Sequence, residues 1–78
     1  MKVVVNIKLK DGVLDPQGKA SLHALSSIGF DNVLDARIGK QIVLELEEND
    51  KVKAKQSVTK MCEELLANTV IEDYDIEL

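Results

Sequence analysis

The sequence predicts an α+β domain in which an antiparallel sheet is covered on one face by two helices. Three patterns lead to this prediction. Apolar and polar residues alternate near both ends of the chain and in its middle, as in strands with one wet face. Between these segments lie two stretches with apolar residues at helical spacing. The resulting order, β-α-β-β-α-β, is that of the split-βαβ or ferredoxin-like arrangement, and 78 residues suit a single domain, 1–78.

The first strand and the first helix are marked by strong local signals. Residues 2–10 alternate, with one side made of Val3, Val5, Ile7 and Leu9. Asp15 is suited to cap a helix, because its carboxylate can accept a hydrogen bond from a free amide of the first turn. Pro16 fits the next position, where its missing N–H costs nothing. We therefore expect a helix over 16–28, ended by Gly29 in the left-handed conformation.

The middle region, residues 33–47, allows two interpretations. Six of its apolar residues share one parity: Leu34, Ala36, Ile38, Ile42, Leu44 and Leu46. A two-residue hairpin loop at 39–40 would put the two halves of this set on opposite faces. Either the turn has an odd number of residues, or one long strand bends at Gly39. We favour two strands, 33–38 and 42–47, while the long bent strand would offer an edge for pairing with a second subunit.

A second helix and a last strand complete the chain. Asn49 or Asp50 can cap a helix over 51–67, and Asn68 suits its C-terminal end. The apolar stripe of this helix is Ala54, Val58, Met61, Cys62 and Leu65. From residue 70 onward apolar residues alternate with carboxylates, which predicts a final strand with an acidic outer face.

Composition excludes several classes of protein. A net charge of −4 argues against sequence-independent binding of nucleic acid, which needs clustered lysine and arginine. No apolar run approaches the length that spans a membrane, and the N-terminus does not resemble a signal peptide, so we expect a cytoplasmic protein. One cysteine allows no internal disulfide, and no metal-binding cluster is evident. Because so short a chain has a thin core, we expect it to self-associate.

No catalytic constellation is found in the sequence. His23 flanks the apolar stripe of the first helix, and no motif places a nucleophile near it. Cys62 lies on the buried stripe of the second helix, where a core role is favoured. Tyr74 is favoured as a residue of the sheet face. A binding, regulatory or subunit role therefore fits better than catalysis by this chain alone.

The chain resembles the PurS family, the small subunits of phosphoribosylformylglycinamidine synthase. The resemblance covers nearly the whole chain. It rests on Gly12-Val13-Leu14-Asp15-Pro16-Gln17-Gly18, on Leu25 to Phe30, on Arg37-x-Gly39-Lys40, on Met61 to Asn68 and on Val70-Ile71-Glu72-Asp73-Tyr74. One departure is Thr69, where the family pattern leads us to expect proline.

This resemblance implies a non-catalytic subunit of a three-component ligase in purine biosynthesis. A glutaminase subunit would release ammonia, and a large synthetase subunit would use ATP and Mg²⁺ to convert the formamide into the amidine. The PurS-like subunit, as a homo-dimer or homo-tetramer, would bridge the two and help to keep ammonia from solvent, where it would be protonated and lost. The resemblance implies no cofactor on this chain.

The resemblance also nominates residues that contact the partner subunits. They are Asp15, Gln17, Arg37, Lys40, Glu72 and Asp73. Arg37 and Lys40 are the strongest candidates, since both are charged and flank a glycine turn. A different class of function stays open from the residues alone, namely an ACT-like module that binds a small molecule.

Overall fold

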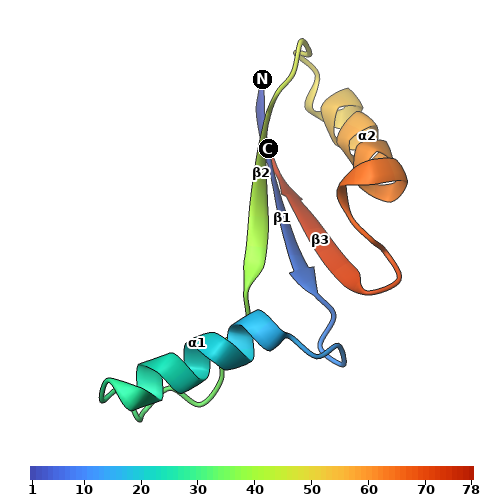
Figure 1. Ribbon diagram of the computed structural model, residues 1–78. Coiled ribbons are helices and arrows are strands. Elements are labelled where there is room, and N and C mark those ends of the chain that lie inside the picture. Colours follow the sequence, from blue (N-terminus) through green and yellow to red (C-terminus); the bar gives the residue numbers. More distant parts are fainter.

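The computed structural model describes all 78 residues as three strands and two helices. The elements are β1 (Lys2–Leu9), α1 (Pro16–Ser27), β2 (Gly39–Glu45), α2 (Lys51–Met61), a π-helical turn η1 (Cys62–Leu66) and β3 (Glu72–Glu77). Figure 1 shows the sheet, in which β1 lies between β2 and β3 and is antiparallel to both. The predicted α+β class and ferredoxin-like arrangement are confirmed.

The core lies between the sheet and α2. Alternate residues of β1 point to this side, and Val3, Val5 and Ile7 are almost fully buried. Ala54 and Val58 of α2 pack against them, together with Cys62 and Ala67. The core is therefore a single layer beneath one helix, as expected for so short a chain.

The predicted strand over 33–38 is absent. Both edges of β1 are occupied by β2 and β3, so a fourth strand could join only at an outer edge of the sheet. The backbone amide of Ile38 instead donates to the Asp15 carboxylate, at 2.7 Å. The strand of this region is β2, Gly39–Glu45, so neither the hairpin of strands 33–38 and 42–47 nor one long strand bent at Gly39 is formed.

Helix α1 does not lie on the sheet of its own chain. Figure 1 shows it leaving the end of β1 and projecting past β2, with the following segment returning to the foot of β2. None of its hydrophobic residues is buried: Leu22 and Leu25 are half-buried and Ile28, just after it, is 70% exposed. We call α1 and residues 28–38 together the arm. Within one chain, only α2 covers the sheet.

The second helix changes geometry near its end. Predicted as one helix over 51–67, it is α-helical to Met61 and then forms the π-helical turn η1. The amide of Ala67 donates to the carbonyl of Cys62, five residues back, at 3.1 Å. Because the wider turn changes the spacing of side chains, Leu65 is 82% exposed, and its predicted place on the buried stripe is wrong.

Two further sequence predictions can be compared with the structure. Cys62 is fully buried, as predicted, and burial raises the pKa of its thiol above the usual value. His23 is exposed on α1. No helix has the length and apolar character needed to cross a membrane.

Shortening a core side chain of α2 is expected to destabilise the fold strongly. Val58 has no exposed surface, so Val58→Ala should lower the free energy of unfolding by about 2 kcal/mol. The matched control is Val52→Ala on the same helix, where the side chain is 65% exposed and the change should be small. Urea unfolding followed by circular dichroism measures both variants. Equal losses for the two variants would contradict this placement of the core.

Candidate protein–protein interface

The six residues nominated from the sequence gather at one end of the sheet, where β1 ends and β2 and β3 begin. A cavity of about 240 Å³ there is lined by four of them, Asp15, Gln17, Lys40 and Glu72. A second, larger cavity of about 660 Å³ is lined by Arg37, Lys40 and Asp73, among others. We call these six residues the end-of-sheet cluster.

Asp15 joins the first helix to the foot of β2. One carboxylate oxygen accepts from the amide of Gly18 at 2.9 Å, which caps α1 as predicted. The other oxygen accepts from the amide of Ile38 at 2.7 Å. The hydrogen bonds from Ile38 and Gly18, and the nearby charge of Arg37, lower the pKa of the Asp15 carboxyl, although burial opposes this shift.

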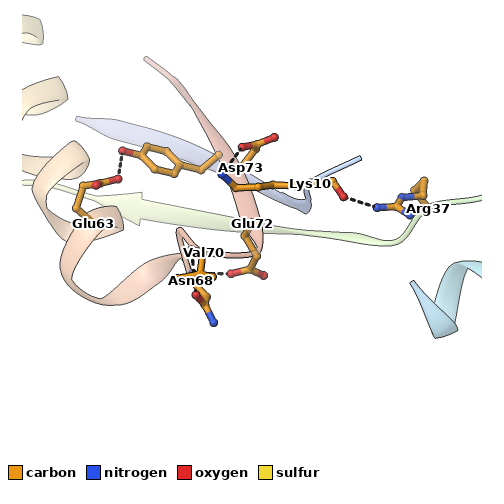
Figure 2. Close-up of polar contacts among 8 residues, drawn as sticks. Lys10, Arg37, Glu63, Asn68, Val70, Glu72 and Asp73 are labelled. Atoms are coloured by element: carbon orange, nitrogen blue, oxygen red, sulfur yellow. Dashed lines mark hydrogen bonds and ion pairs between the residues drawn. The ribbon is translucent and has the colours of Figure 1, made fainter. Parts of the chain in front are cut away.

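Arg37 holds the same junction from the opposite side. Its two terminal nitrogens donate to the carbonyls of Val13, at 2.9 Å, and Lys10, at 3.0 Å. Figure 2 shows the contact between Arg37 and Lys10. The guanidinium forms no ion pair with a carboxylate inside the chain. Arg37 therefore links the β1–α1 turn to the start of β2 through backbone carbonyls, while its side chain stays exposed.

Glu72 and Asp73 order the turn before β3. The Glu72 carboxylate accepts from the amide of Asn68 at 2.7 Å, and the Asn68 side chain accepts from the amide of Val70 (Figure 2). Asp73 lies 3.7 Å from the ammonium group of Lys10. Both carboxylates are thus engaged within the chain.

Gln17 and Lys40 are the two cluster residues whose side chains have no hydrogen bond or ion pair within the chain. Both are exposed. Of the six nominated side chains, these two are therefore the most available to another protein.

Two polar networks near the cluster escaped the sequence analysis. On the bare face of the sheet, Asn6 receives a bond from Gln41 and donates to Asp75 and Glu77, linking all three strands. At the corner of η1, the hydroxyl of Tyr74 donates to the Glu63 carboxylate at 2.7 Å (Figure 2). Both networks join residues far apart in sequence, so only the strand register and the helix position could have revealed them.

The arrangement is suited to recognition rather than to bond chemistry. Apart from Lys40, its charged side chains are engaged within the chain, and no histidine or cysteine lines either cavity. No group of three or more histidine, cysteine, aspartate or glutamate side chains lies close enough to hold a metal ion. The cluster presents charged side chains beside the β1–α1 turn, which Arg37 holds through two hydrogen bonds.

Comparisons with known proteins give one consistent result. The model of the PurS family, described as phosphoribosylformylglycinamidine (FGAM) synthase, matches residues 2–78. A Bacillus subtilis relative, phosphoribosylformylglycinamidine synthase subunit PurS, is 52% identical over 99% of this chain and 90% of its own length. The crystal structure of PurS from Methanocaldococcus jannaschii has a TM-score of 0.89 and 47% identity, covering 97% of this chain and 92% of that one.

A further similar structure contains more than one kind of subunit. A chain in the structure of PurLQS from Thermotoga maritima has a TM-score of 0.89 and 37% identity to this chain. The match covers 97% of this chain and 93% of that one. The projecting arm is therefore compatible with the fold of solved relatives.

The close approach of Gly18 to the backbone of Ala36 predicts a site intolerant of any side chain. A Cβ atom there would collide with the carbonyl oxygen of Ala36 and lie 2.9 Å from the Asp15 carboxylate. Gly18→Ala should therefore lower the free energy of unfolding by about 1–3 kcal/mol. The control is Gly12→Ala, where a Cβ meets nothing within 4 Å, and thermal unfolding compares the two. If both variants unfold at the wild-type temperature, the contact between Gly18 of α1 and Ala36 is not as described.

The lowered pKa of Asp15 predicts a pH-dependent contribution to stability. A carboxylate whose pKa is lower in the folded state stabilises the fold above its ordinary pKa near 3.8 and loses this effect as the pH falls through the folded value. Asp15→Asn should therefore be less stable than wild type at neutral pH, and the difference should shrink as the pH falls below 4. Urea unfolding between pH 7 and about 2.5 measures this difference. A difference independent of pH would contradict the role of the charged carboxylate.

Tyr74 gives a spectroscopic test of its contact with Glu63. The hydrogen bond to Glu63 and burial raise the pKa of Tyr74 to about 12. Because Tyr74 is the only tyrosine, ultraviolet absorbance reports its ionisation alone. Glu63→Gln should move this pKa toward the ordinary value of 10.0, while Glu64→Gln, the neighbouring control, should leave it unchanged. If the pKa of Tyr74 in the Glu63→Gln variant is the same as in the Glu64→Gln control, the contact between Tyr74 and Glu63 is not as described.

Proposed function

The chain belongs to the PurS family, and from this membership we propose that it is a non-catalytic subunit of phosphoribosylformylglycinamidine synthase in purine biosynthesis. The observation that carries the proposal is the family match over residues 2–78. It is supported by the chain of similar fold in the PurLQS structure from Thermotoga maritima. Family membership favours this role over the ACT-like regulatory module.

In the proposed complex this chain bridges two larger subunits. A glutaminase subunit releases ammonia, and a synthetase subunit uses ATP and Mg²⁺ to install it, so this chain itself needs no cofactor. The bridge keeps the two sites together and limits escape of ammonia into water, where it would be protonated. The lack of a catalytic pair in either cavity is compatible with this division of labour. A cytoplasmic location stays a prediction.

The end-of-sheet cluster is the proposed contact with a larger subunit. Gln17 and Lys40 are the residues we expect to reach that subunit directly, because neither is engaged within the chain. Asp15, Arg37, Glu72 and Asp73 hold the backbone that presents them. We expect the side chains that reach the larger subunit to determine the affinity. The side chains that hold the backbone determine the shape of the surface.

We also propose that the chain is a homo-oligomer. Its own core is one layer thick, and α1 buries no hydrophobic residue against the sheet. Large apolar side chains such as Leu34, which is 93% exposed, need a covering surface. A second copy of the chain supplies one without a new partner.

Reconstitution with the synthetase and glutaminase subunits tests the proposed function. Glutamine-driven formation of the amidine should require this chain, whereas the reaction with added ammonium should be much less dependent on it. Lys40→Glu should weaken binding to the complex about tenfold. The matched control is Lys55→Glu, an exposed lysine of α2 remote from the cluster, which should bind as wild type. Full glutamine-driven activity without this chain would overturn the proposal.

A further inference from the structure

The larger of the two cavities lies over the bare face of the sheet. Asn6 and Lys8 alternate with the core residues of β1 and so belong to this face, as do Gln41 and Asp75, which pair with Asn6. All four line the cavity. Its volume of about 660 Å³ falls within the range of about 300–1,000 Å³ that is typical of small-molecule sites. Because α2 packs on the opposite face, the cavity is open to dissolved molecules.

Gly39 leaves a gap in the middle of this cavity. It pairs with Lys8 across the strands, so a side chain at this position would project beside that lysine. A Cβ atom there would lie 2.8 Å from the carbonyl oxygen of Ile7 and 3.7 Å from the Cβ atom of Lys8. The absence of a side chain allows a ligand to approach the backbone of β2 closely.

Two cations border the gap. Lys8 is exposed, and its ammonium group forms no ion pair within the chain. Its cross-strand neighbour Asp73 is paired instead with Lys10, at 3.7 Å (Figure 2). Arg37 lines the same cavity, and its hydrogen bonds to the carbonyls of Lys10 and Val13 leave other N–H groups of the guanidinium free. Both cations are therefore available to an anionic ligand.

These two cations together match the charge of a phosphate monoester. Such a group carries about −1.5 to −2 charges at neutral pH and several acceptor oxygens, so one phosphate can contact both side chains. Guanidinium donors form strong hydrogen bonds to phosphate oxygens. Because Arg37 is already held by two backbone carbonyls, binding costs little of its conformational entropy.

The opposite side of the cavity is acidic. Asp73 and Asp75 lie on β3, which is two strand spacings, or about 10 Å, from β2. One carboxylate oxygen of Asp75 accepts from Asn6 at 3.3 Å, and the other has no partner within the chain. Carboxylates accept hydrogen bonds from hydroxyl groups and repel a second anion. A ligand that fits both sides therefore carries a phosphate at one end and hydroxyl groups at the other.

We propose that this cavity binds a phosphorylated sugar or a nucleotide, with the phosphate over Gly39 between Lys8 and Arg37 and the hydroxyl groups toward β3. This site goes beyond the proposed function, which assigns only protein contacts to the chain. It is also separate from docking through Lys40. That residue pairs with Ile7 of the core, so its side chain leaves β2 on the face covered by α2.

Titration of the isolated chain with ribose 5-phosphate, followed by NMR, tests the site. Amide signals of residues 6–8, 37–41 and 73–75 should shift. Inorganic phosphate should bind several-fold more weakly, because it cannot reach the carboxylates of β3. Lys8→Gln should weaken binding of ribose 5-phosphate about tenfold. The matched control is Lys2→Gln, which changes a lysine on the same strand and face but six residues, or about 20 Å, away.

Each outcome bears on the proposal. If ribose 5-phosphate shifts none of these signals at concentrations up to about 10 mM, the site is overturned. Equal losses in Lys8→Gln and Lys2→Gln would show attraction by general charge and would overturn it as well. Equal shifts with unphosphorylated ribose would overturn the role of the cations. Both lysines are exposed, so circular dichroism should show both variants to be folded.

A variant on the acidic side tests the class of ligand. Asp75→Asn should weaken binding of ribose 5-phosphate, although the loss of a negative charge would by itself favour an anion. Glu77→Gln is the matched control, because Glu77 also accepts from Asn6, at 3.1 Å, but does not line the cavity. Unweakened binding to Asp75→Asn would overturn the contact with the sugar hydroxyl groups. None of these titrations measures glutamine-driven synthesis, so failure here is separate from failure of the proposed function.

Discussion

The structure depends on one buried carboxylate that serves two distant backbone amides. Asp15 starts α1 through Gly18 and at the same time fixes Ile38, 23 residues further along the chain. The second bond takes an amide that a fourth strand would have used and places the start of β2 beside the end of β1. Arg37 secures the same junction through two carbonyls. Because hydrogen bonds to a charged group are stronger than neutral ones, this junction directs the arm away from the sheet.

The direction of the arm determines which surfaces the chain presents. With α1 displaced, the sheet keeps one helix on one face and a polar network centred on Asn6 on the other. The end-of-sheet cluster lies beside the junction and includes Arg37 of the arm and Lys40 of β2, so the charged cluster adjoins the apolar residues of the arm. Charged and apolar side chains that adjoin one another are typical of a surface that recognises another protein.

The sequence predicted those features that are encoded within a few neighbouring residues. The cap at Asp15, the proline after it and the alternation of Val3, Val5 and Ile7 are local signals, and the corresponding elements begin within a few residues of the predicted positions. The end-of-sheet cluster was nominated from a family pattern, and the fold brings its members together. A contact between these residues and a larger subunit depends also on the surface of that subunit, which the sequence of this chain does not encode.

Features set by tertiary contacts could not be predicted in this way. Residues 33–38 carry a strand pattern, yet both edges of β1 are already occupied, and the amide of Ile38 is bonded elsewhere. The stripe of the second helix predicted Leu65 as buried, because regular α-helical spacing was assumed through η1. This wide turn has one more consequence. Its last hydrogen bond spans five residues instead of four, so the turn holds one residue more than an α-helical turn before the backbone becomes extended at Ala67 and leads back to β3.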